Sequence, residues 1–188
     1  IFQKVFSLRQ SFLQKRNMEV IYIIDGLNEN SGEPVYSAEL NFVGEYAYLN
    51  KKINHDKYIY MVLCDTRAVK NEEEKKLLKY IAKISNEAHM ALMKYMAPGL
   101  NERDTENFFL QYLRDKYYTR FWAYGCICAS GANAATLHYD LNNRDMEDGD
   151  IYLTDMGIRF CGYCSDISNT FPVNGKFTDK QKKFIILY

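Results

Sequence analysis

Apolar residues recur at helical spacing along two segments in the middle of the chain. The first begins near Asn71 and presents one apolar stripe, formed by Leu77, Leu78, Ile81, Ile84, Ala88, Ala91, Leu92 and Tyr95. Asn71 and Glu74 have the spacing of a capping box, and Pro98-Gly99 provides the stop. The second covers residues 102–117, and its apolar face consists of Phe108, Phe109, Tyr112 and Leu113. Both patterns predict amphipathic helices.

Shorter apolar runs follow these helices, separated by Gly and Asn residues that favour turns. The runs cover residues 124–130, 135–140, 150–157 and 163–172. Their length and composition predict β-strands. The order of elements indicates the α/β class, and more narrowly an α+β arrangement in which helices lie on an antiparallel sheet.

The first third of the chain lacks this helical order. The apolar run over residues 18–25 predicts a strand, and residues 28–34 have the composition of a loop. Two aromatic stretches, residues 42–49 and 58–63, are candidate strands. We interpret residues 1–63 as the end of an α/β domain and residues 64–188 as part of a second domain.

Composition narrows the classes of function. Lys plus Arg and Asp plus Glu number 24 each, so the net charge gives no indication of nucleic acid or an anionic membrane as a partner. No apolar run approaches the roughly 18 residues of a membrane span. An odd number of cysteines, five, without a signal-peptide pattern favours reduced thiols in the cytoplasm. The chain begins at Ile1, however, so a targeting segment could precede it.

Two aspartates, Asp155 and Asp166, interrupt the last two predicted strands. A hairpin turning near Phe160-Cys161 would place them opposite each other, with Cβ atoms about 4.5–5.5 Å apart. Two carboxylates that close repel each other unless they share a proton or hold cations between them. Oxygen ligands favour Mn, Mg or Co over a structural zinc, and rigid paired carboxylates suit a two-metal site. Spacing alone equally allows a bland alternative, with one aspartate in solvent and the other stabilising the turn.

The other candidate functional groups are histidines and a pair of cysteines. His138 lies at the end of the strand predicted over residues 135–140, and a single histidine is more often structural than catalytic. His89 lies within the first helix and suggests no mechanism. Cys161 and Cys164 have the spacing of a redox or zinc pair, but no second such pair completes a zinc site. We interpret them as turn and strand residues.

The chain also resembles a known family. Five blocks carry the resemblance in order: ISNEAH, APGLNE, CICASGANAATLHYD, DGDIYLTDMG and CSDISNTFPVNGKFTDKQK. They are similar to the creatinase/aminopeptidase P/prolidase group, the metallopeptidases of the pita-bread fold. Upstream, DGLNENSGEP and TRAVKNEEEKKLLKYIAKISNEAH extend the likeness over nearly the whole chain. Within the group it is greatest to the prolidases of eukaryotes, which are Xaa-Pro dipeptidases.

The resemblance implies roles for four residues. Asp155 falls on the first metal-binding aspartate of the family, and Asp166 on the second, which bridges two divalent ions. Manganese is the ion expected, with Co, Zn or Mg as alternatives. His138 falls on the active-site histidine that contacts the bound dipeptide and stabilises the reacting carbonyl, and Tyr124 on a tyrosine near the metals that we assign to substrate binding. A water activated by the two ions would attack the peptide bond before proline.

The resemblance also sets expectations for the whole protein. Residues 1–63 would end a creatinase-like N-terminal domain, and residues 64–188 would form the first half of the pita-bread domain. The family completes its metal site with a histidine and two glutamates from the second half, so we expect this chain alone to be inactive. The resemblance also implies that the full-length protein is a cytoplasmic homodimer. The expected substrates are Xaa-Pro dipeptides or short peptides.

Two alternatives to a dipeptidase stay open. The stretch DLNNRDMEDGD after His138-Tyr139 is closer to the form found in aminopeptidase P, which acts on longer X-Pro peptides. A non-catalytic pita-bread protein that binds partners is the other. At the chain's end, Thr178 and Gln181 predict a helix start without a C-cap, so we expect the protein to continue.

Overall fold

A computed structural model describes residues 21–23, 32, 53–55 and 57–186 of the chain. The chain divides into two compact units, Ile1–Lys70 and Asn71–Tyr188. Among the described residues, no helix combines the length and the apolar character that crossing a membrane requires.

The described residues of the first unit form two short strands and one helix. Strands β1 (Ile21–Ile23) and β2 (Ile53–His55) pair in parallel, and β1 lies within the strand predicted over residues 18–25. The strand suggested for residues 58–63 is wrong, because these residues belong to helix α2 (Lys57–Ala68). No Gly, Pro or Asn interrupts α2, so a helix can pass through the aromatic run. The candidate strand over residues 42–49 lies outside the described residues.

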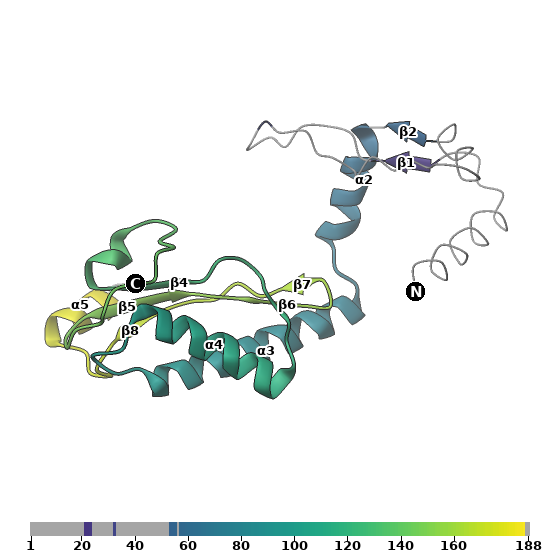
Figure 1. The fold of residues 1–188 in the computed structure, drawn as a ribbon. Coiled ribbons are helices and arrows are strands. Elements are labelled where there is room, and N and C mark those ends of the chain that lie inside the picture. The colour runs from purple at the N-terminus through teal and green to yellow at the C-terminus, as the bar shows by residue number, and fades with distance from the viewer. Residues whose placement is uncertain (1–20, 24–31, 33–52, 56, 187–188) are drawn as a thin grey trace, which may run out of the picture. The chain divides into compact units, whose positions relative to one another are not determined.

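The second unit begins with the two predicted helices, α3 (Glu72–Tyr95) and α4 (Glu102–Tyr117). The capping box of α3 is present: the Asn71 side chain accepts from Glu74 N at 2.9 Å, and the Glu74 carboxylate accepts from Asn71 N at 2.7 Å. Asn101 caps α4 in the same way with Asp104. The two helices lie side by side along the strands (Figure 1).

Six short strands form two antiparallel sheets. One has the order β4-β5-β8, with β4 (Ile127–Ser130), β5 (Ile151–Asp155) and β8 (Ser168–Pro172). The other has the order β3-β6-β7, with β3 (Phe121–Trp122), β6 (Ile158–Phe160) and β7 (Tyr163–Cys164). Three of the four predicted strand regions are therefore confirmed. Helix α5 (Asp179–Ile186) then follows the predicted capping box of Thr178 and Gln181.

The strand predicted for residues 135–140 is wrong. A 3-10 helix, η2 (Gly131–Ala135), occupies its start, and a turn follows it. Gly131, His138 and Asn142 have positive φ angles of 54°, 53° and 44°, which a strand cannot accommodate. The alternation of apolar and polar residues in this stretch therefore does not correspond to a β-strand.

The hydrophobic core lies between the helices and the strands. The stripes predicted on α3 and α4 contribute Ile81, Ile84, Ala88, Leu92, Phe109 and Leu113. The strand side of the same cluster contains Cys126, Cys128, Tyr152, Met156, Ile158 and Val173. Burial of both sets fixes the face of the sheets that packs on the helices.

Candidate functional site

Asp155 and Asp166 lie close together and share a hydrogen-bond donor. Asp155 ends β5, and Asp166 lies in the link between β7 and β8. The hydroxyl oxygen of Tyr124, in the link between β3 and β4, is 2.6 Å from Asp155 Oδ1 and 3.1 Å from Asp166 Oδ1. Both carboxylates thus converge on the same hydroxyl. Because a phenol has a single proton, it can donate to only one of them at a time. The structure thus brings three of the four predicted site residues together.

The register of the strands differs from the expected one. Asp155 is opposite Ser168 rather than Asp166. The cause is the turn of the hairpin, which consists of Cys161 and Gly162 with φ angles of 50° and 85°, as in a two-residue type I′ turn. A turn one residue later than expected moves the pairing by two positions. The two aspartates are therefore diagonal neighbours on one face of the hairpin, at about 7–8 Å between backbones, instead of direct partners.

A glycine faces Asp166 across the hairpin. The backbone hydrogen bonds on either side run from Met156 N to Ile167 O at 3.2 Å and from Ser165 N to Ile158 O at 3.0 Å. This pairing places Gly157 across from Asp166. A Cβ atom on Gly157 would lie 1.9 Å from Ser165 O and 3.0 Å from Tyr124 Cε1. Glycine is required here because the second strand and the tyrosine ring both approach its backbone closely.

The charges of the two aspartates have no protein counter-charge among the described residues. Neither Asp155 nor Asp166 forms an ion pair with a Lys, Arg or His in that part of the chain. Burial raises the pKa of the Tyr124 hydroxyl, and its hydrogen bond to Asp155 raises it further. The phenol therefore stays protonated and donates to the carboxylates at neutral pH. Two converging carboxylates with one neutral donor between them are suited to bind a cation.

Helix α3 supports this hairpin from the core side. The buried His89 ring places Nε2 3.0 Å from Met156 O, next to Asp155 in sequence. A carbonyl can only accept, so Nε2 carries the proton and Nδ1 is the unprotonated nitrogen. Burial lowers the pKa of His89 and keeps the ring neutral. The sequence suggested no mechanism for His89, and its contact with the backbone of the aspartate hairpin could not be read from the helical pattern.

Two serines join the helix to the other strand of the hairpin. Ser85 Oγ of α3 lies 2.7 Å from Ser165 Oγ, which also accepts from Ile158 N at 3.1 Å. Ser165 precedes Asp166 directly, and both serines are buried. Both strands that carry the aspartates are therefore fixed to α3 by side-chain hydrogen bonds.

His138 is not brought into hydrogen-bonding contact with the aspartates. It is exposed, it follows η2 in a turn, and its φ angle is 53°. The predicted position at the end of a strand is wrong because the segment between β4 and β5 leaves the sheet at Gly131. Among the described residues, no three His, Cys, Asp or Glu side chains gather closely enough to hold a metal ion.

The cysteines occupy the places expected of turn and strand residues. Cys161 lies in the hairpin turn and Cys164 in β7, and both are exposed. Cys126 and Cys128 are buried, and burial raises the pKa of each thiol to about 12. Buried thiols with such a pKa remain protonated and unreactive at neutral pH.

The donor set of the candidate site consists of carboxylate oxygens. Asp155 and Asp166 suit a hard or borderline divalent ion, which prefers oxygen ligands, and no thiol joins them within the described residues. Two carboxylates supply only part of the four to six ligands that such ions take. The donor chemistry of the two carboxylates therefore fits one side of a shared metal site.

Comparison with known proteins places these residues in a family context. The model of metallopeptidase family M24 matches residues 76–187, which include Tyr124, His138, Asp155 and Asp166. The Xaa-Pro dipeptidase of Rattus norvegicus is 38% identical over 176 residues, which are 92% of this chain and 35% of that protein. The Xaa-Pro aminopeptidase of Haemophilus influenzae is 36% identical over 122 residues, or 65% of this chain and 28% of its own.

A solved structure shares the fold. An aminopeptidase of Pseudomonas aeruginosa matches with a TM-score of 0.66 at 36% identity, covering 72% of this chain and 30% of its own. The chain spans about a third of the length of the curated dipeptidases that it matches.

Proposed function

Because the chain belongs to metallopeptidase family M24, we propose that Asp155 and Asp166 bind divalent metal ions in a peptidase that cleaves the bond before proline in Xaa-Pro dipeptides. The observation that carries the proposal is the convergence of both carboxylates on the Tyr124 hydroxyl. When bound, two such ions lower the pKa of a water and polarise the scissile carbonyl. The chain's own contribution is to hold the two carboxylates in place.

Each of the other two site residues has a proposed role. Tyr124 donates to Asp155 or Asp166 and orients whichever carboxylate it holds. Its proposed further role is to contact a substrate bound beside the ions. His138 is exposed and can turn its ring to a bound peptide, where an imidazolium or a donating imidazole stabilises charge on the reacting carbonyl oxygen. A proline nitrogen offers no N–H, so recognition of this substrate relies on ring shape and on the carboxylate.

Dipeptidase and aminopeptidase P are the two candidate activities. The dipeptidase relative matches 92% of this chain, whereas the aminopeptidase relative matches 65%. This difference in coverage favours the dipeptidase. The aminopeptidase alternative keeps two points of support: the stretch DLNNRDMEDGD is closer to the aminopeptidase P form, and a solved structure that shares the fold is an aminopeptidase.

The test is hydrolysis by the full-length protein, loaded with Mn, of Gly-Pro and of a longer peptide with proline in second position. Turnover of Gly-Pro alone, lost on chelation and restored by Mn, is the expected result. Turnover of the longer peptide alone would instead establish the aminopeptidase. A protein that binds Mn but cleaves neither peptide would refute the peptidase and favour a binding function.

Manganese is proposed as the preferred ion, because carboxylate ligands favour it over a zinc of the structural type. The measurement is the activity restored by Mn, Co, Zn and Mg in turn after chelation. Equal or greater activity with zinc would overturn the preference. A homodimer in the cytoplasm is the accompanying proposal for the full-length protein, and analytical ultracentrifugation would test the dimer.

A further inference from the structure

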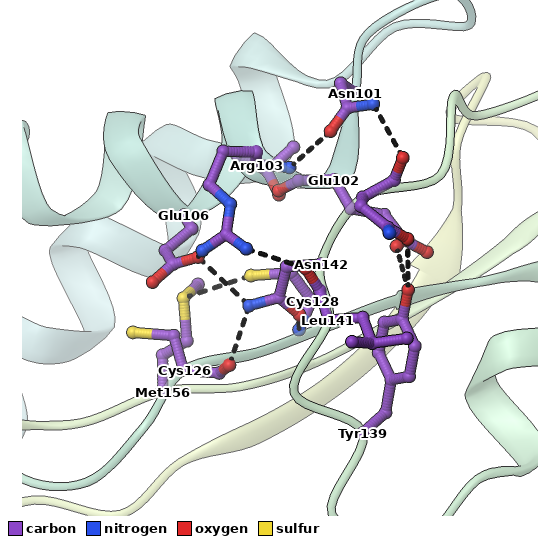
Figure 2. A network of polar contacts seen from close by, with 12 residues as sticks. Asn101, Glu102, Arg103, Glu106, Cys126, Cys128, Tyr139, Leu141, Asn142 and Met156 are labelled. Atoms are coloured by element: carbon purple, nitrogen blue, oxygen red, sulfur yellow. Dashed lines mark hydrogen bonds and ion pairs between the residues drawn. The ribbon is translucent and has the colours of Figure 1, made fainter.

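Apart from the two aspartates, another carboxylate stands out: Glu102, in the first turn of α4, is fully buried. An ionised group in that position is costly unless hydrogen bonds replace its water. Those hydrogen bonds come from residues 130–144, the segment that leaves β4 and carries His138. Figure 2 shows the Tyr139 side chain reaching toward Glu102 from this segment.

The two oxygens of Glu102 hold the segment at its beginning, middle and end. Oε1 accepts from Ser130 N and from Ser130 Oγ, both at 2.7 Å. Oε2 accepts from the Tyr139 hydroxyl at 2.7 Å and from Arg144 N at 3.0 Å. Asn133 Nδ2 approaches both oxygens, at 3.2 and 3.4 Å. The Glu102 carboxylate thus contacts the segment at three points along its course, and the buried Asn142 side chain ties the segment to Cys126 O and Cys128 N at the start of β4.

The hydrogen bonds also decide the charge of Glu102. Burial raises the pKa of this carboxyl, but the bonds from Tyr139, from Arg144 N and from Ser130 together outweigh burial and lower it. Glu102 is therefore an acceptor on both oxygens at neutral pH, and the Tyr139 hydroxyl is a donor to it.

Tyr139 is the buried anchor nearest to His138. It is 6% exposed, whereas its neighbours Leu137 and Leu141 are 86% and 60% exposed and His138 is also exposed. His138 itself has a φ angle of 53°, a conformation that non-glycine residues keep only where the surroundings hold it. The Tyr139 hydroxyl donates to Glu102 at 2.7 Å and accepts from Asn133 Nδ2 at 2.9 Å. Its bond to the Glu102 carboxylate is the charge-assisted contact of the residue next to His138.

We propose that Glu102 and Tyr139 are positioning residues for His138: the hydrogen bond between them holds residues 136–141 in the backbone conformation that presents the histidine ring to substrate. The proposal rests on the catalytic role proposed for His138 and extends it to two buried residues that do not touch the substrate. It also gives a role to the buried Glu102 carboxylate, which makes no contact with the two aspartates in the hydrogen bonds described above.

The test uses Tyr139→Phe in the full-length, Mn-loaded protein, because this change removes the hydroxyl and keeps the buried ring. The expected result is a kcat for Gly-Pro lowered about tenfold, with KM changed less than about twofold. In a His138→Ala background the same change is expected to lower kcat no further. Tyr118→Phe is the matched control, because Tyr118 is 88% exposed, and it is expected to leave kcat unchanged.

A purely structural role gives another pattern. Equal losses of kcat from Tyr139→Phe with and without His138 would overturn the proposal. Glu102→Gln is a second variant, which keeps the shape of the side chain but turns one acceptor into a donor. It is expected to show the same dependence on His138, and a kcat equal to that of the unmodified protein in either variant would contradict the proposal.

An activity-independent measurement separates this proposal from the proposed function. The ring signals of His138 in the NMR spectrum are expected to shift or broaden in Tyr139→Phe, while those of His89 stay in place. Unchanged His138 signals would overturn the positioning role even if the peptidase activity is real. If His138→Ala keeps full kcat, the catalytic role of His138 is wrong, and the NMR result still decides whether Tyr139 positions it.

Discussion

The hairpin that carries Asp155 and Asp166 and the segment that carries His138 are held in place by different means. In the hairpin, backbone hydrogen bonds continue from β5 and β8 through to β6 and β7, so the ladder sets where each aspartate lies. Residues 131–144 lie outside the sheets, and side-chain hydrogen bonds hold them instead, chiefly those of Glu102 and Asn142. The positions of the aspartates should therefore be sensitive to substitutions that crowd the backbone, and the position of His138 to the loss of single polar groups.

The largest effect is expected from Asp166→Asn in the full-length protein. The change removes one ligand charge from the proposed metal site and leaves the ladder intact, so activity is lost without loss of fold. We expect kcat for Gly-Pro to fall by at least about 100-fold, since metal ions contribute several kcal/mol to such reactions. Steady-state kinetics and the metal content of the purified variant measure the effect.

Asp115→Asn is the control for this change. Asp115 is an exposed carboxylate in the last turns of α4, where it accepts from Gln111 at 2.6 Å. It is expected to keep normal kinetics and metal content. Full metal content and turnover in Asp166→Asn would show that this aspartate is not a ligand, and would leave the hairpin with a structural role only.

Gly157→Ala tests the ladder itself. The added Cβ would lie 1.9 Å from Ser165 O, a backbone atom that cannot move without shifting Asp166. We expect a free energy of unfolding lower by about 3 kcal/mol or more, because overpacking against backbone has no cheap relief. Urea unfolding followed by circular dichroism measures it.

Gly125→Ala is the matched control, because it is the same substitution at a glycine that directly follows Tyr124 in the chain. A Cβ on Gly125 would meet no atom within 4 Å. Its free energy of unfolding is expected to change by less than about 0.5 kcal/mol. Equal stabilities for the two alanine variants would mean that the hairpin is not as closely spaced as described.

Tyr124→Phe makes the comparison with Tyr139→Phe direct, because both changes remove one hydroxyl. In the hairpin, the ladder keeps Asp155 and Asp166 in place after the hydroxyl is lost. We expect metal affinity to fall about tenfold, at the low end of the range for groups that orient metal ligands, with unchanged stability. Isothermal titration with Mn measures the affinity. An affinity lower by about 1000-fold or more would show that the hydroxyl, and not the ladder, holds the pair.

The helices and the aspartate face could be predicted because their signals are local. Asn71 with Glu74 forms the predicted capping box, and the apolar stripes of α3 and α4 face the core. The common face of Asp155 and Asp166 follows from the alternation of side chains along strands. The register of the hairpin could not be predicted, because Cys161 has a positive φ angle, which is unusual for a cysteine.

The His138 segment could not be predicted for the opposite reason. In the sequence, Glu102 resembles an ordinary acidic residue at an exposed helix start, where its charge would interact favourably with the helix dipole. Its burial depends on Ser130, Tyr139 and Arg144, which lie about thirty or forty positions further along the chain. Without that contact, the apolar alternation around Tyr139 has the pattern of a strand. Long-range side-chain pairing is the part of this fold that sequence patterns do not contain.

The smallest predicted effect concerns His89, one of the side chains that join α3 to the hairpin. Burial lowers its pKa, so the folded state resists a proton that the unfolded chain binds near pH 6.5. The free energy of unfolding of the metal-free protein is therefore expected to be constant above about pH 7 and to fall as the pH drops below about 6.5. Urea midpoints at pH 7.5, 6.5 and 5.5 measure the slope. His89→Gln is expected to reduce the dependence of the urea midpoint on pH. His138→Gln is the control, because His138 is exposed, and it should leave that dependence unchanged. An unchanged dependence in His89→Gln would assign it to other groups.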